Sequence, residues 1–279
     1  MVNVKTKIIT ILIIVSMSFC MYAVPLKTNE KIYGPVIVST ASDVLSQKKL
    51  VQNENSVFGE TFNTRPIFSV DVKKNKKKYI SLTFDSSWND AQTIPLLNVL
   101  DEFDAKATFF LTAFYVRRHQ KSVQEILRRG HEIGNHSNTH VKFTEIRDDT
   151  IVREIENCHR TIKEVAGIDT CLFRFPYGEY NATSVRLLKE RGYYPIQWTR
   201  DSLDWKNLGT MAIIRKLGEE DSYHAGNIIL FHNGADYTVE ALKTVLLIIK
   251  QKGLRCVRVS DMIYEKDFYV DMNGVQREK

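Results

Sequence analysis

The alternation of strand and helix is clearest in residues 79–111, which read YISLTFDSSWNDAQTIPLLNVLDEFDAKATFFL. Tyr79–Phe84 and Ala107–Leu111 are short runs rich in aromatic and β-branched residues, as is typical of buried strands. Ala91–Phe103, between them, has the apolar spacing of a helix. A strand, a helix and a second strand in this order predict a βαβ unit, whose strands are parallel.

The same alternation continues to the end of the chain. Further strands are predicted over residues 132–134, 171–175, 194–199, 227–231 and 255–259. Further helices are predicted over residues 122–129, 145–165, 181–191, 210–220 and 239–250, with Asn181 as an N-cap and Gly130, Gly167 and Gly192 as helix ends. This pattern predicts an α/β fold of parallel strands with crossover helices, either an open doubly wound sheet or a barrel.

Unusual polar residues follow the predicted strands, at the point where each strand ends. In chain order they are Asp85, His136, His140, Arg174 with Pro176, Asp201 and His232. The carboxyl ends of parallel strands lie on one face of an α/β fold, where active sites are built. We therefore expect these side chains to lie together around one opening, called the mouth, at the carboxyl ends of the strands.

The chemistry of these residues indicates hydrolysis. His136 and His140 lie four residues apart and can offer two imidazoles to one divalent cation, although two ordinary hydrogen-bonding histidines would have the same spacing. Asp85 would bring a carboxylate that takes a proton from water, and His232 a group that protonates a departing amine. A base, an acid and a Lewis acid at one mouth predict metal-assisted hydrolysis of an amide or ester.

Five segments carry a family resemblance. They are Leu82-Thr-Phe-Asp85, Gly134-Asn-His-Ser-Asn-Thr-His140, Phe173-Arg-Phe-Pro-Tyr-Gly178, Asp201-Ser-Leu-Asp-Trp205 and Ile229-Leu-Phe-His232. In order and spacing they resemble the five motifs of the polysaccharide deacetylase (NodB homology) family, carbohydrate esterase family 4. The resemblance implies a distorted barrel of about seven β/α units, with parallel strands and outer helices. It also implies removal of acetyl groups from a polymer such as peptidoglycan, chitin or xylan.

The resemblance implies a role for each matching residue. Asp85 would be the general base, held ionised by Arg174. The alternative for Arg174 is a purely structural ion pair. His136 and His140 would bind a divalent metal, usually zinc, with cobalt or manganese as alternatives. His232 would be the general acid.

The remaining roles implied by the resemblance concern the surroundings of the acid and the acetyl group. Asp201 would raise the basicity of His232, unless it is only a helix N-cap. The backbone N–H of Tyr177 would bind the oxyanion. The substrate pocket would be formed by Trp205 and Leu230, unless these are core residues, together with Pro176 and Trp88.

The chain departs from the family pattern directly after the base. Family members commonly carry a second aspartate there, which completes the metal site, whereas this chain has Ser86. A hydroxyl is a poor ligand for a divalent cation. We hypothesise that Asp90 folds back to supply the missing carboxylate. The loop Ser86-Ser-Trp-Asn-Asp90 is similar to loops of sporulation-associated deacetylases.

The ends of the chain indicate export. Residues 1–24 have a short cationic start and an apolar run, as in a signal peptide or an N-terminal membrane anchor. Residues 25–75 are predicted as a polar linker, 76–268 as the catalytic domain and 269–279 as a polar tail. The expected location is outside the cell, in the wall or tethered to the outer face of the cytoplasmic membrane. Three widely spaced cysteines beyond residue 24 do not form a disulfide framework.

Charge says little about the substrate. The formal net charge of +6 and the pI of about 9.0 favour anionic surroundings. A nucleic-acid binder would explain the charge but none of the strand-end residues, so the predicted partner is a cell-wall glycan. Two alternatives to N-deacetylation are a catalytically silent glycan-binding protein and an O-acetyl esterase. Oligomeric state is not predicted.

Overall fold

The computed structural model describes residues 64–73, 76–218 and 222–279. These residues belong to one compact unit, Thr61–Lys279. The predicted signal or anchor at residues 1–24 and most of the predicted linker lie outside the described residues. Among the residues described, no helix has both the length and the apolar character needed to cross a membrane.

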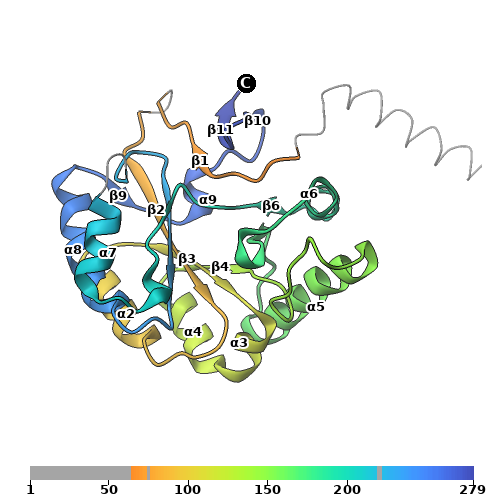
Figure 1. Cartoon of the computed structure of the whole chain (residues 1–279), viewed down its shortest axis with the longest axis horizontal. Helices are drawn as coiled ribbons and strands as arrows, with labels where there is room; N and C mark the ends of the chain where they lie inside the picture. The colour runs from red at the N-terminus through yellow and green to blue at the C-terminus, as the bar shows by residue number, and fades with distance from the viewer. Residues whose placement is uncertain (1–63, 74–75, 219–221) are drawn as a thin grey trace, which may run out of the picture. The chain divides into compact units, whose positions relative to one another are not determined.

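A curled parallel sheet forms the centre of this unit (Figure 1). Its strands, in spatial order, are β6 (Tyr194–Pro195), β5 (Leu172–Phe173), β4 (Glu132–Asn135), β3 (Ala107–Leu111), β2 (Tyr79–Ser86), β8 (Ile228–His232) and β7 (Arg200–Asp201), with β9 (Arg255–Cys256) beside the start of β2. Adjacent strands are parallel throughout. The predicted α/β class is confirmed, and the sheet is an incomplete barrel whose ends are β6 and β7.

Helices connect the strands and cover the outside of the sheet. They are α2 (Thr93–Glu102), α3 (Ala113–Arg118), α4 (Gln120–Arg128), α5 (Asp148–Ala166), α6 (Ala182–Lys189), α7 (Thr210–Gly218), α8 (Thr238–Gln251) and α9 (Val259–Met262). The predicted caps are confirmed: Asn181 forms a capping box with Ser184, and Gly167 ends α5 in the left-handed conformation with φ 71°. Helix α3 was not expected from the sequence, because six residues are too few for a helical pattern of apolar residues to be recognised.

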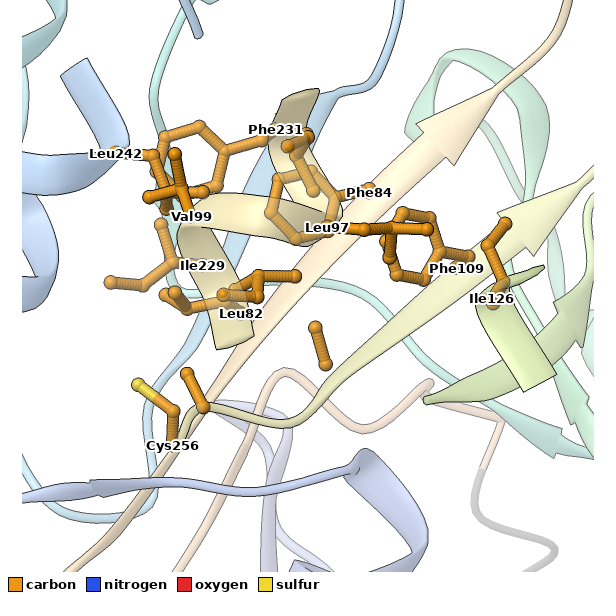
Figure 2. Packing of buried hydrophobic residues seen from close by; sticks show 14 of the residues in the cluster. Leu82, Phe84, Leu97, Val99, Phe109, Ile126, Ile229, Phe231, Leu242 and Cys256 are labelled. Carbon is orange, nitrogen blue, oxygen red and sulfur yellow. The ribbon is translucent and has the colours of Figure 1, made fainter. Parts of the chain in front are cut away.

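The two faces of β2 carry different kinds of side chain, because successive residues of a strand point to opposite faces. The outward residues belong to the main apolar core beneath α2 and α8: Ile80, Leu82 and Phe84. Figure 2 shows Phe84 between Phe109 and Phe231 of the neighbouring strands, with ring centroids 5.0 and 5.5 Å away. The inward residues are polar and buried: Ser81, Thr83 and Asp85. The interior of the sheet is therefore built to hold polar groups.

The predicted linker ends earlier than expected, because residues from Ile67 onward belong to the domain. Ile67 pairs with Ile196 beyond β6, and Ser69 pairs with Asn227 before β8, so this segment lies across the gap in the barrel. It contains strand β1 (Ser69–Val70). At Gly226, φ is +91° and a Cβ would lie 1.9 Å from the carbonyl oxygen of Val70, so the close crossing requires glycine.

The predicted polar tail is also wrong, because the C-terminus is folded. Strands β10 (Phe268–Val270) and β11 (Val275–Glu278) form an antiparallel hairpin, and β11 pairs with β1. Gln276 is fully buried, and its amide exchanges two hydrogen bonds of 2.8 and 2.7 Å with the backbone of Tyr264. A buried polar side chain is stable when it is paired in this way, so polarity alone did not mark a tail.

The cysteines in the described part of the chain are free. Cys158 and Cys256 are buried, as expected of core residues, whereas Cys171 is exposed.

Candidate active site

Asp85 and His232 lie side by side at the carboxyl ends of two central strands. They are register partners in the parallel pairing of β2 with β8. Asp85 is buried, and the His232 side chain is 30% exposed, so the pair is open to solvent on the histidine side. The fold therefore brings these two predicted site residues together.

The buried side chain of Arg174 holds the carboxylate of Asp85 in place. This side chain is fully buried, and Nη1 donates to Asp85 Oδ1 at 2.9 Å and to Thr83 Oγ1 at 2.8 Å. Nη2 donates to the carbonyl oxygen of Gln197 at 3.1 Å, and Nε to that of Ile196 at 3.4 Å. Burial alone would raise the pKa of Asp85, but the positive charge of Arg174, with smaller contributions from nearby histidines, lowers it below the usual range. Asp85 is therefore an ionised carboxylate with a fixed orientation.

Replacing Arg174 by Met is expected to lower the free energy of unfolding by about 3–5 kcal/mol, because it leaves the Asp85 carboxylate buried without its counter-ion. Urea unfolding followed by circular dichroism measures the change. Arg153→Met is the control, since Arg153 forms an exposed pair with Asp149 at 2.9 Å and should cost at most about 1 kcal/mol. Equal losses in the two variants would contradict this account of Arg174.

The two predicted metal-binding histidines lie together beside Asp85. His136 Nδ1 contacts the carbonyl oxygen of Arg174 at 2.9 Å, and because a carbonyl can only accept, this nitrogen carries the proton. His136 Nε2 faces Asp85 Oδ2 at 3.5 Å, and the ring centroids of His136 and His140 are 4.9 Å apart. Burial lowers the pKa of His136, and burial followed by the proximity of His136 lowers the pKa of His140 to about 3. Both rings are therefore neutral near pH 7, as a ligand requires.

Residues that sequence reasoning missed hold the histidine loop. Asn135 Oδ1 accepts from the backbone N–H of Ser137, whose hydroxyl accepts from that of His140, each at 2.9 Å. The carboxylate of Glu154, on α5, accepts from the backbone and the hydroxyl of Thr139 at 2.7 and 2.8 Å. Asn135 lies inside the quoted histidine motif, but nothing in the sequence linked Glu154 to it.

The histidines fit two positions of a metal site. The Nδ1 atom of His140 is buried with no hydrogen-bond partner among the residues that the structure describes, which is costly unless another group uses its lone pair. Within residues 64–73, 76–218 and 222–279, however, no three His, Cys, Asp or Glu side chains are grouped so as to hold a metal ion. The described residues thus offer fewer protein ligands than a usual zinc site has.

The hypothesis that Asp90 supplies the missing ligand is wrong. Asp90 Oδ2 accepts a hydrogen bond of 2.6 Å from the Ser122 hydroxyl, and Oδ1 lies 3.2 Å from His119 Nδ1. These partners are close to one another at the start of α4, and they hold the carboxylate there. The sequence could not show this, because it does not say which surface the loop packs against.

The carboxylate that binds His232 is Asp204, not the predicted Asp201. Asp204 Oδ1 contacts His232 Nδ1 at 2.8 Å, and Oδ2 accepts from the His232 backbone N–H at 2.8 Å and from the Thr238 hydroxyl at 2.6 Å. Burial would lower the pKa of His232, but the hydrogen bond and charge of Asp204 raise it above the ordinary imidazole value. Asp201 instead accepts from the backbone N–H of Leu203 at 2.8 Å, and burial raises its pKa.

Comparison with known proteins now decides the family. A model of the polysaccharide deacetylase family matches residues 72–196. A peptidoglycan-N-acetylglucosamine deacetylase of Bacillus cereus is 32% identical over 197 residues, which are 69% of this chain and 91% of that protein. This chain belongs to the polysaccharide deacetylase family.

Other family members bear on the activity. A peptidoglycan-N-acetylmuramic acid deacetylase of Bacillus subtilis, PdaA, is 28% identical over 69% of this chain and 74% of that protein. The crystal structure of a family 4 pseudoenzyme from Bacillus anthracis matches with a TM-score of 0.68 and 26% identity, over 78% of this chain and 74% of the other. The reported relatives in this family thus include named deacetylases and a named pseudoenzyme.

The departure from the polysaccharide deacetylase pattern at Ser86 is visible in the structure. Ser86 is fully buried at the end of β2, and in the described part of the chain its hydroxyl has no hydrogen-bond partner. A buried polar group without a partner costs about 1–3 kcal/mol. The serine at this position therefore lowers the stability of the folded polypeptide.

The predicted pocket residues of this family member differ in exposure. Pro176 begins a 3₁₀ turn (Pro176–Gly178) in which Tyr177 has φ 60°, and the Tyr177 ring packs edge-on to His140 at 4.6 Å. Leu230 is buried on the same strand face as His232. Among the predicted site residues, the aromatic side chains of Trp88, Tyr177 and Trp205 are exposed, at 62%, 58% and 54%. Exposed aromatic rings at a mouth can stack against sugar rings.

Proposed function

We propose that the protein is a peptidoglycan N-deacetylase that hydrolyses the acetamide of an amino sugar, releasing acetate and leaving a free amine. The observation that carries this proposal is the pairing of Asp85 with His232, each with its own counter-group, Arg174 and Asp204. Family membership and the names of the relatives supply the substrate class. The apolar N-terminus supports export to the wall or the outer face of the cytoplasmic membrane.

In the proposed reaction, Asp85 takes a proton from water as the water oxygen adds to the acetamide carbonyl carbon. The backbone N–H of Tyr177 donates to the oxygen that becomes negatively charged. Protonated His232 then gives its proton to the nitrogen, and the bond between carbon and nitrogen breaks. A divalent metal held by His136 and His140 would polarise the carbonyl and acidify the water.

Replacing Asp204 by Asn is expected to move the alkaline limb of the pH profile to lower pH. Activity requires ionised Asp85 and protonated His232, so kcat/KM rises through the lowered pKa of Asp85 and falls through the raised pKa of His232. Without the Asp204 charge the pKa of His232 falls, and the descending limb should move by about one pH unit or more.

The profile of kcat/KM against pH measures this shift, and Asp201→Asn is the matched control. Asp201 has no hydrogen bond to His232 and should move the limb less. A larger shift in Asp201→Asn would return the supporting role to that residue.

The activity is tested by incubating purified residues 26–279 with acetylated peptidoglycan and with chitin oligomers, with and without zinc or cobalt. Mass spectrometry of the glycan and assay of free acetate should show deacetylated sugars that depend on added metal. The same assay with O-acetylated substrates distinguishes N-deacetylation from the esterase alternative. An esterase would release acetate only from the O-acetylated substrates.

A second candidate is a glycan-binding protein without catalysis. Ser86 in place of a metal-binding aspartate favours it, as does the likeness to a family 4 pseudoenzyme. Saturable binding of peptidoglycan with no acetate released under any divalent metal would establish this alternative and exclude the proposed reaction.

A further inference from the structure

The loop Ser86–Asp90 is fixed at both of its ends by backbone hydrogen bonds. The backbone N–H of Thr112 donates to the Ser86 carbonyl at 3.1 Å, and the Thr112 hydroxyl donates to the Ser87 carbonyl at 3.2 Å. At the far end, the backbone N–H of Thr93 donates to the Asp90 carbonyl at 2.9 Å. The centre of the loop, Trp88, needs a separate support.

His119 provides the support at Trp88. Its Nε2 donates to the Trp88 carbonyl oxygen at 2.9 Å. The Trp88 ring then lies edge-on to His140 with the centroids 5.0 Å apart. The next residue, Asn89, fills the space beside Gly234, where an added Cβ would lie 3.0 Å from its amide nitrogen. The loop centre thus touches His140 on one side and the turn after His232 on the other.

His119 is itself held on the scaffold. It joins α3 to α4, its side chain is 17% exposed, and its Nδ1 faces Asp90 Oδ1 at 3.2 Å. Its ring packs on Tyr115 at 4.8 Å, and the Tyr115 hydroxyl accepts from Asn233 at 3.1 Å. The backbone N–H of Asn233 donates to the carbonyl oxygen of Asp85 at 3.2 Å. The same polar cluster therefore reaches the strand that carries the proposed base.

We infer that His119 is a positioning residue for the active-site loop: by holding the Trp88 carbonyl it places Trp88 against His140 and closes one wall of the mouth. The effect on catalysis rests on the proposed deacetylase function, whereas the placement of Trp88 does not. Groups that hold active-site ligands from behind commonly change activity or metal affinity by about 10–100-fold when removed.

Two substitutions at His119 distinguish the effect of losing the hydrogen bond to Trp88 from the effect of changing the size of the side chain. A glutamine amide nitrogen reaches the position of Nε2, so His119→Gln keeps the donor to the Trp88 carbonyl. An asparagine amide nitrogen reaches only the position of Nδ1, so His119→Asn loses that donor and places its amide toward Asp90. Gln120→Ala is the control for any disturbance of the start of α4, because Gln120 is exposed.

The primary readout is independent of activity. The full-length chain, labelled with 5-fluorotryptophan, has three fluorine signals, since it contains three tryptophans. Trp88→Phe assigns one of them. We expect the Trp88 signal of wild type, His119→Gln and Gln120→Ala to coincide, and that of His119→Asn to move toward the position of a freely exposed indole. In acetate release, His119→Asn should lower kcat about ten-fold, and His119→Gln should recover most of the loss.

The outcomes distinguish the inference from the proposed function. An unmoved Trp88 signal in His119→Asn would overturn the positioning role, whatever the activity. Equal displacement in both His119 variants would also overturn it, because the hydrogen bond to Trp88 would not be the cause. If the Trp88 signal is displaced in His119→Asn alone, and the wild-type protein releases no acetate, the positioning role is supported and the proposed deacetylation is rejected.

Discussion

Asp85→Asn is expected to lower kcat for acetate release about a thousand-fold. Asparagine keeps the shape and can still accept the hydrogen bond from Arg174, which in the native protein is 2.9 Å from Asp85 Oδ1. It cannot take a proton from water, and a positioned general base contributes about 10²–10⁴-fold to a rate. The lowered pKa of Asp85 means that the native carboxylate is fully available as a base near pH 7.

The measurement is initial-rate acetate release at saturating glycan, with a thermal melt to verify folding. Asp101→Asn is the control, since it removes a surface carboxylate that pairs with Arg129 at 2.9 Å and should leave the rate unchanged. A folded Asp85→Asn variant within a few-fold of wild type would exclude Asp85 as the base.

Ser86→Asp is expected to tighten zinc binding about a thousand-fold. The substitution adds a carboxylate to a site that otherwise offers two imidazoles, which brings the set to three protein ligands, as in catalytic zinc sites. Partners that only orient metal ligands change metal affinity by about 10–100-fold. A direct ligand should increase zinc affinity by more than this. Isothermal titration calorimetry measures the affinity, and acetate release should rise with it if the wild-type protein is short of metal.

The stability of this variant should also depend on zinc. Position 86 is fully buried, so an unpaired carboxylate there is costly until a cation binds. We expect Ser86→Asp to melt below wild type in chelator and to gain more from added zinc.

Asp90→Asn is the matched control for Ser86→Asp. It keeps an acceptor for the Ser122 hydroxyl and should leave zinc affinity unchanged. A loss of zinc binding in Asp90→Asn, with no gain in Ser86→Asp, would restore Asp90 as the ligand.

The sequence by itself determined the α/β class and the location of the mouth. Strands such as Tyr79–Ser86 and Ile228–His232 have local apolar patterns, and parallel strands bring their carboxyl ends to one edge. These two facts place Asp85 and His232 together without any knowledge of tertiary contacts. The caps at Asn181 and Gly167 were likewise predictable, because capping depends on neighbouring residues only.

Tertiary structure alone decided which carboxylate serves which histidine. Asp201 and Asp204 lie three residues apart in one motif, but Asp204 begins a 3₁₀ turn bounded by left-handed Leu203 (φ 54°) and Asn207 (φ 51°), and its Oδ1 lies 2.8 Å from His232 Nδ1. Asp90 was misassigned for the same reason, since its partners His119 and Ser122 lie at the start of α4, about 30 residues away. Both ends of the domain, including the buried Gln276, were hidden because very short strands have no detectable period. Local patterns fix where backbone elements form, whereas the direction of a loop side chain depends on contacts with segments distant in the chain.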